Sequence, residues 1–133
     1  MSKYPIEIEL RKGQKGVVRP LEIGDKEKLK GFFVGFPSEE TKFLKGERND
    51  IGFIEKWIKE SLKQLYVPLV AEVKEKIIAL ISCRQPKDSR SEHFRDIVLL
   101  VDLEYRPSRI RSVLSKELFD NILAEKKKKP SAE

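Results

Sequence analysis

Two nearly uninterrupted apolar runs constrain the fold of this chain more than any other feature. They are VPLVAEV (67–73) and IIALISCRQ (77–85), and only three charged residues, Lys74, Glu75 and Lys76, separate them. A strand exposed on one face alternates apolar and polar residues, whereas a nearly continuous apolar run indicates burial on both faces. We therefore expect an antiparallel hairpin inside a sheet that helices cover on both sides.

Three further segments have strand patterns. Residues 6–10 alternate apolar and acidic residues, which is typical of a half-exposed strand, and Gly13 and Gly16 are expected to break the pattern. A short extended segment is expected over residues 17–23 and a long strand over residues 93–105. Strands that follow one another in sequence are expected to pair antiparallel.

Four segments place apolar residues at helical spacing on one face. The expected helices cover residues 26–36, 38–44, 51–65 and a last segment from residue 109 into the lysine run, with Leu65 and Leu123 on buried faces. Their expected N-caps are Asp25, Ser38, Asp50 and Ser108. This order predicts an α/β (α+β) architecture with a mostly antiparallel central sheet flanked by helices, not a doubly wound parallel sheet.

The composition indicates one domain with an ordinary apolar core. We expect this domain over residues 1–125 of the 133-residue chain, followed by a basic disordered tail at 126–133. A hydrophobic share of 39%, with 7 Phe, 3 Tyr and 1 Trp, excludes disorder of the whole chain. One Cys excludes a disulfide scaffold, and one His with one Cys excludes a zinc site built from the usual ligands, so no metal is expected.

The positive charge is concentrated near the C-terminus. Residues 106–129 hold eight Lys or Arg against three acidic residues, and therefore five of the six net positive charges. This favours a local anionic partner over a surface that coats nucleic acid. Because no apolar run is long enough to cross a bilayer and no signal-peptide pattern is present, we expect a cytoplasmic protein without a membrane partner.

Three segments of the chain follow one another in a familiar order: VVRPLEIGDKEKLKGFF, PLVAEVKEKIIALISC and IVLLVDLEYRPSRIRSVLSKELFDNIL. In sequence and order they resemble the GCN5-related N-acetyltransferase (GNAT) superfamily, and the resemblance covers roughly residues 16–126. It implies a GNAT-like sheet and helices that lack the final strands of the family.

The third segment resembles the acetyl-CoA motif of that family, V-x-P-x-Y-R-G-x-G-I-G. The matching residues are Val101, Tyr105, Arg106 and Ile110, while Pro107, Arg109 and Arg111 occupy the three glycine positions. The resemblance implies that acetyl-CoA binds with its pyrophosphate at the start of the last helix, where backbone N–H groups favour anions. The residues implied at this site are Leu103, Arg106, Ser108, Arg109, Ile110 and Arg111. An ordinary basic helix start fits the same arginines.

An acetyltransferase also needs a base that takes a proton from the amine. The candidates are Glu92, His93 and Asp96, at the start of the third long strand. The alternative for Glu92 and His93 is an exposed loop end that has no catalytic role. Cys83 is expected to be a small buried hydrophobe rather than a nucleophile. Trp57 and the four phenylalanines between residues 32 and 43 are expected in the core, with some of them lining an acceptor groove.

Two functions fit these features. The resemblance implies an acyl-CoA-dependent N-acyltransferase, or a shortened relative, in which a small-molecule or protein amine attacks the thioester directly. The loss of the three glycines and of the final strands favours the alternative, a non-catalytic GNAT-like binding or regulatory module that contacts a protein partner. A homodimer that lends a strand to the open sheet edge would rebuild the missing wall of an enzyme.

Overall fold

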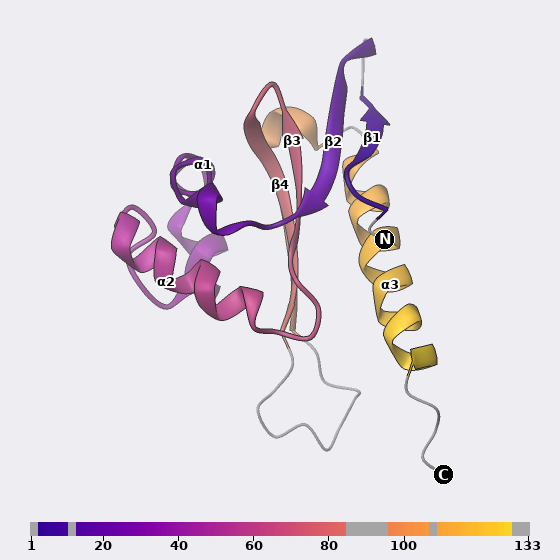
Figure 1. Cartoon of the computed structure of the whole chain (residues 1–133). Helices are drawn as coiled ribbons and strands as arrows, with labels where there is room; N and C mark the ends of the chain where they lie inside the picture. Colours follow the sequence, from indigo (N-terminus) through magenta and orange to yellow (C-terminus); the bar gives the residue numbers. More distant parts are fainter. Residues whose placement is uncertain (1–2, 11–12, 85–95, 107–108, 129–133) are drawn as a thin grey trace.

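The computed structural model describes residues 3–10, 13–84, 96–106 and 109–128. Their strands form one five-stranded sheet (Figure 1). The strands are arranged in chain order, and every pairing is antiparallel, as predicted. They are β1 (Ile6–Glu9), β2 (Lys15–Pro20), β3 (Leu69–Val73), β4 (Lys76–Arg84) and β5 (Asp96–Val101).

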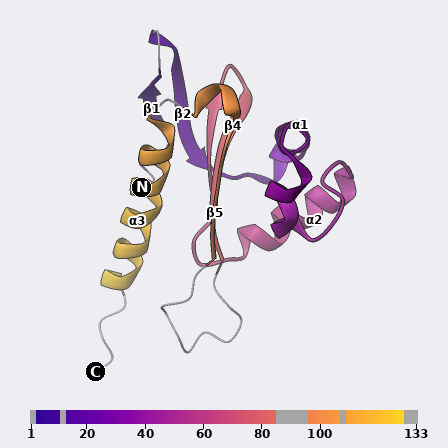
Figure 2. The ribbon, with the colours of Figure 1, turned by 180° about the vertical axis from the view of Figure 1, so that it is seen from behind.

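Helices cover both faces of the sheet. α1 (Lys26–Phe33) and α2 (Ile51–Leu62) pack on one side, the α1/α2 face, and α3 (Ile110–Lys128) packs on the other, the α3 face (Figures 1 and 2). Short 3-10 helices connect these elements: η2 (Ile23–Asp25), η3 (Ser38–Leu44) and η4 (Leu103–Tyr105). The predicted α/β architecture is therefore confirmed.

The hairpin of β3 and β4 is buried on both faces, as its apolar runs predict. On β4, Leu80 packs with α1 and α2, while its neighbour Ile81 packs with α3. Only Lys74 and Glu75 form the turn, and both have positive φ angles, 51° and 64°. Two-residue turns with this backbone conformation match the right-handed twist of the strands and therefore hold their register.

One predicted helix cap is confirmed and another is wrong. Asp50 Oδ1 accepts hydrogen bonds from the backbone N–H groups of Gly52 and Phe53, at 2.9 and 3.4 Å, and so caps α2. Ser38 is instead the first residue of η3, whose N-cap is Pro37, and its side chain does not cap that helix.

The third long strand ends earlier than predicted, and its expected first residues, 93–95, lie outside the described residues. β5 ends at Val101 because Asp102 Oδ1 accepts a hydrogen bond from the backbone N–H of Glu104, at 2.9 Å, and starts η4. A short polar side chain that binds nearby backbone in this way competes with strand pairing.

Gly16 does not break the first strand pattern but lies inside β2. A Cβ atom there would come within 2.8 Å of the Glu72 carbonyl oxygen on β3. Glycine is therefore needed because the two strands approach closely at this point.

The apolar faces of two helices also differ from expectation. Leu65 lies beyond the end of α2 and is exposed, and Leu123 is exposed on α3. The helix α3 extends to Lys128 and so reaches into the lysine run, as expected.

A buried cluster of charges holds α1 against the sheet. Arg19 on β2 donates hydrogen bonds to both carboxylate oxygens of Asp25, at 2.9 and 2.8 Å, and to Glu72 Oε1 on β3, at 3.0 Å. Lys28 on α1 pairs with the other oxygen of Glu72. Asp25 also accepts from the backbone N–H of Glu22, at 2.8 Å, so this residue binds within the cluster and makes no capping hydrogen bond to α1.

This cluster should make the stability of the fold depend on pH. Burial by itself raises the pKa of Asp25, but the hydrogen bonds from Arg19 and from the Glu22 backbone outweigh burial, so that the pKa is lowered overall. The pKa of Glu72 is lowered in the same way by Lys28 and Arg19. Carboxyl groups with a lowered folded-state pKa stabilise the fold above their unfolded values, about 3.9 and 4.3, and this contribution is lost as pH falls through the folded values. We therefore expect the urea midpoint to be nearly level above about pH 5 and to fall below it.

The variant Asp25→Asn tests the origin of this pH dependence, because it keeps the shape of the side chain and removes its titration. We expect a lower midpoint at pH 7 and a shallower loss of stability between about pH 5 and pH 2. An unchanged slope in the variant would assign the acid sensitivity to other groups.

Candidate functional site

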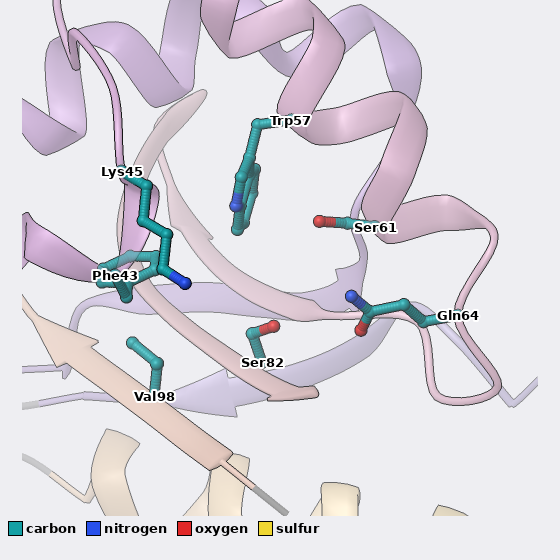
Figure 3. Close-up of a pocket in the computed structure, with 7 residues that line it drawn as sticks. All are labelled: Phe43, Lys45, Trp57, Ser61, Gln64, Ser82 and Val98. Carbon is teal, nitrogen blue, oxygen red and sulfur yellow. The ribbon is translucent and has the colours of Figure 1, made fainter. Parts of the chain in front are cut away.

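A pocket of about 140 Å³ opens on the α1/α2 face, between α2, the end of η3 and the strands β4 and β5 (Figure 3). Its lining residues come from segments that are far apart in the sequence. They are Phe43, Lys45, Trp57, Ser61, Gln64, Ser82 and Val98.

The strand side of the pocket carries a hydroxyl where the pattern of the sheet calls for an apolar group. Ser82 on β4 pairs directly with Val98 on β5. Both lie on the same face as Leu80 and Leu100, two residues away along each strand, which are core residues. Ser82 is only 6% exposed, so its hydroxyl faces the pocket from a buried position (Figure 3).

The helix side of the pocket combines an aromatic ring with a second hydroxyl. Trp57 and Ser61 are one turn apart on α2 and only 7% and 2% exposed. The Trp57 ring is held edge-to-face by Phe33, at a centroid distance of 5.8 Å, and by Phe43, at 6.2 Å. The expected core position of these aromatics is confirmed, and Phe43 and Trp57 also line the pocket.

Gln64 and Lys45 complete the pocket with features that cost stability. Gln64 Oε1 is buried and has no hydrogen-bond partner within the described part of the chain. A buried acceptor left unpaired costs about 1–3 kcal/mol. Lys45 has φ 57°, a left-handed conformation that is unfavourable for a residue with a side chain, and its ammonium group extends toward the hollow (Figure 3). Unpaired buried groups and strained backbone are common at functional sites.

The chemistry offered by this pocket is that of binding. Aromatic and aliphatic walls surround two hydroxyls, one carboxamide and one ammonium group, and no carboxylate, histidine or cysteine belongs to its described lining. No group of three or more His, Cys, Asp or Glu suited to a metal ion occurs among the described residues. In that same part of the chain, no helix has the length and apolar character needed to cross a membrane.

The residues expected at an acetyl-CoA site are only partly brought together. Arg109 and Arg111 are exposed at the start of α3 and form no ion pair within the described ranges. Arg106 donates from Nε to the Val101 carbonyl oxygen, at 3.1 Å, and from Nη2 to Glu40 Oε1, at 3.3 Å.

The other residues of that expected site differ in their exposure. Leu103 is 73% exposed on η4, whereas the Ile110 side chain is fully buried in the core of the α3 face. Ser108 lies outside the described residues, as do the expected bases Glu92 and His93. Cys83 is buried, as expected for a small core residue.

Four polar residues of the pocket are not among the site residues that the sequence predicts. Ser61 and Ser82 could have been found, because each places a hydroxyl on the buried face of an otherwise apolar element. Lys45 and Gln64 lie in irregular segments after η3 and α2, where no periodicity indicates which way a side chain points.

No protein-family model matches this sequence, and no curated protein matches it either. Solved structures do match. The structure superposes on the GNAT domain of S. lividans PAT with a TM-score of 0.69 and 18% identity, over 91% of this chain and 73% of that one. It superposes on an acetyltransferase of the GNAT family from Streptococcus pneumoniae with a TM-score of 0.68 and 17% identity, over 82% and 68% of the two chains. This chain has the GNAT fold.

A third structure with the same arrangement is an uncharacterized protein from Bacillus halodurans, with a TM-score of 0.56, 14% identity, and coverage of 91% of this chain and 66% of that one. The fold implied by the three sequence segments is therefore confirmed. Within the GNAT fold of this chain, the pocket lies on the α1/α2 face where β4 and β5 pair.

Proposed function

We propose that this chain is a GNAT-like acyl-CoA-dependent N-acyltransferase, which transfers an acetyl group from acetyl-CoA to an amine. The fold supports the general kind of activity, since one superposing structure is an acetyltransferase of the GNAT family. The observation that carries the proposal is the pocket beside Ser82 and Val98. It presents buried hydrogen-bonding groups where a purely structural core would place apolar side chains.

In this proposal the pocket binds and orients the amine, and β5 faces the thioester. β5 is the edge strand of the described sheet, so the outer side of its backbone is open to hydrogen bonds. The amine nitrogen attacks the thioester carbonyl carbon, a C–N bond forms, the C–S bond breaks, and the thiol takes up the proton that the amine loses. Glu92 and His93 are the proposed bases.

Acetyl-CoA binding and acetyl transfer test the proposal. We expect calorimetric titration with acetyl-CoA to give saturable binding, and a panel of amines to release the free CoA thiol in the presence of the protein. If no binding occurs at millimolar acetyl-CoA, the proposal fails and the non-catalytic binding module is favoured.

Arg109 and Arg111 are the proposed partners of the CoA phosphates. Both are exposed: Arg109 directly precedes α3 and Arg111 lies in its first turn, where the helix dipole favours anions. Each of Arg109→Ala and Arg111→Ala should weaken acetyl-CoA binding roughly 10-fold or more, because a hydrogen bond to a charged group contributes about 1.5–3 kcal/mol. The weakening should diminish at high salt.

The matched control is Lys59→Ala, which removes one exposed positive charge from α2 on the other face of the sheet. We expect acetyl-CoA affinity within about twofold of the original protein for this control. Equal losses in all three variants would mean that net charge, rather than these arginines, attracts the ligand.

A further inference from the structure

We infer that the acceptor bound by the pocket is a small amino acid or a similar amino-carboxylate, selected by Lys45 and Gln64. The inference rests on the proposed function, in which this pocket holds the amine. It names the class of amine and excludes diamines, polyamines and simple alkylamines as preferred acceptors.

The charge of the pocket supports an anionic group on the ligand. Lys45 is the charged residue among the described lining, it extends toward the hollow, and it forms no ion pair within the described ranges (Figure 3). A carboxylate beside the Lys45 ammonium group completes an ion pair. A second ammonium group, as in a diamine, would lie beside Lys45, and the lining formed by the described residues has no carboxylate to neutralise it.

The carboxamide of Gln64 supports a hydrogen-bond donor on the same ligand. Its Oε1 atom is buried and has no partner among the described residues, so it gains one when an N–H group enters the pocket. Ser82 presents its hydroxyl from the adjacent strand (Figure 3). Both oxygens are uncharged, so they can hold an amine without stabilising its protonated, non-nucleophilic form as a carboxylate would.

The size and the walls of the pocket limit the rest of the ligand. A volume of about 140 Å³ resembles cavities that accept one benzene-sized group. Phe43, Trp57 and Val98 provide the apolar surface around it. A short aliphatic side chain, such as that of leucine, fits these limits.

The fluorescence of Trp57 provides the test, because it is the one tryptophan of the sequence and lines the pocket. The full chain is titrated, without acetyl-CoA, with L-leucine and with 3-methylbutylamine, which is leucine without its carboxylate. We expect leucine to bind at least 10-fold more tightly than the amine. Equal affinities, tighter binding of the amine, or no fluorescence response to leucine would each overturn the inference.

Variants assign the preference to the named side chains. Lys45→Ala should abolish the preference for leucine, and Lys45→Arg should keep it. The control Lys42→Ala should leave the preference unchanged, because Lys42 is on the same segment but does not line this pocket. Gln64→Leu should weaken binding of both ligands and raise the thermal midpoint, since it removes the unpaired oxygen. Retention of the preference in Lys45→Ala would overturn the assignment to Lys45.

Comparing ligand binding with acetyl transfer distinguishes a failure of this inference from a failure of the proposed function. If leucine binds with the expected preference but no acetyl group is transferred to it, the proposed acyltransferase activity fails and the ligand class stands. If acetyl transfer occurs equally well to 3-methylbutylamine and leucine, the activity stands and the ligand class is wrong.

Discussion

Replacing Asp25 by alanine is expected to lower the free energy of unfolding by about 3–5 kcal/mol, because it leaves the Arg19 guanidinium group buried without its main partner. The side chains of Asp25 and Arg19 are only 4% and 13% exposed, and two hydrogen bonds of 2.8 and 2.9 Å join them. Since a domain of this size is stable by only about 5–15 kcal/mol, urea unfolding should show a large fall in the midpoint.

A second carboxylate of this chain provides the matched control. Asp120 pairs with Lys116 one turn away on α3, at 2.9 Å, but its side chain is 38% exposed. Asp120→Ala should therefore shift the urea midpoint very little. Similar losses in Asp25→Ala and Asp120→Ala would show that burial of the Arg19 cluster does not decide its contribution.

The elements built from local patterns could be predicted from the sequence. The apolar runs on either side of Lys74 and Glu75 indicated a hairpin buried on both faces, and the structure has Leu80 and Ile81 facing opposite cores. Asp50 could be recognised as a helix cap because the capping interaction spans only three residues.

Contacts between distant residues could not be predicted in this way. Nothing local indicates that Arg19 pairs with Glu72, 53 residues later, or that Gly16 is needed for the approach of β3. The early end of β5, just before Asp102, is different. The Asp102 side chain binds backbone two residues away, which is a local feature that the apolar pattern of the strand concealed.

The candidate pocket was harder to predict than the sheet that carries it. Trp57 and Phe43 have apolar side chains that a core and a ligand site both use, so the sequence alone leaves their role open. Gln64 is informative only through the absence of a partner for its oxygen, and that depends on packing around it in three dimensions. The fold therefore follows from local sequence patterns. The site depends instead on which polar side chains the folded chain leaves without hydrogen-bond partners.

Filling the pocket should abolish acetyl transfer without unfolding the protein. In Ser82→Leu a larger apolar side chain enters the 140 Å³ hollow from its strand side, opposite Val98, and occupies the space proposed for the acceptor. We expect the rate of acetyl transfer at a fixed amine concentration to fall at least ~100-fold, equivalent to about 2.7 kcal/mol of lost transition-state stabilisation. The thermal midpoint should stay level or rise, because the new side chain buries apolar surface that was previously beside a cavity.

Two measurements decide whether Ser82→Leu acts by blocking the acceptor. Acetyl-CoA binding should remain within about threefold of the original value, since the proposed phosphate partners Arg109 and Arg111 lie at the start of α3, on the opposite face of the sheet. The control Ser115→Leu makes the same substitution at an exposed position of α3 and should retain full transfer. If Ser82→Leu transfers acetyl groups as fast as this control, the amine binds elsewhere, and the polar groups of the pocket need another explanation.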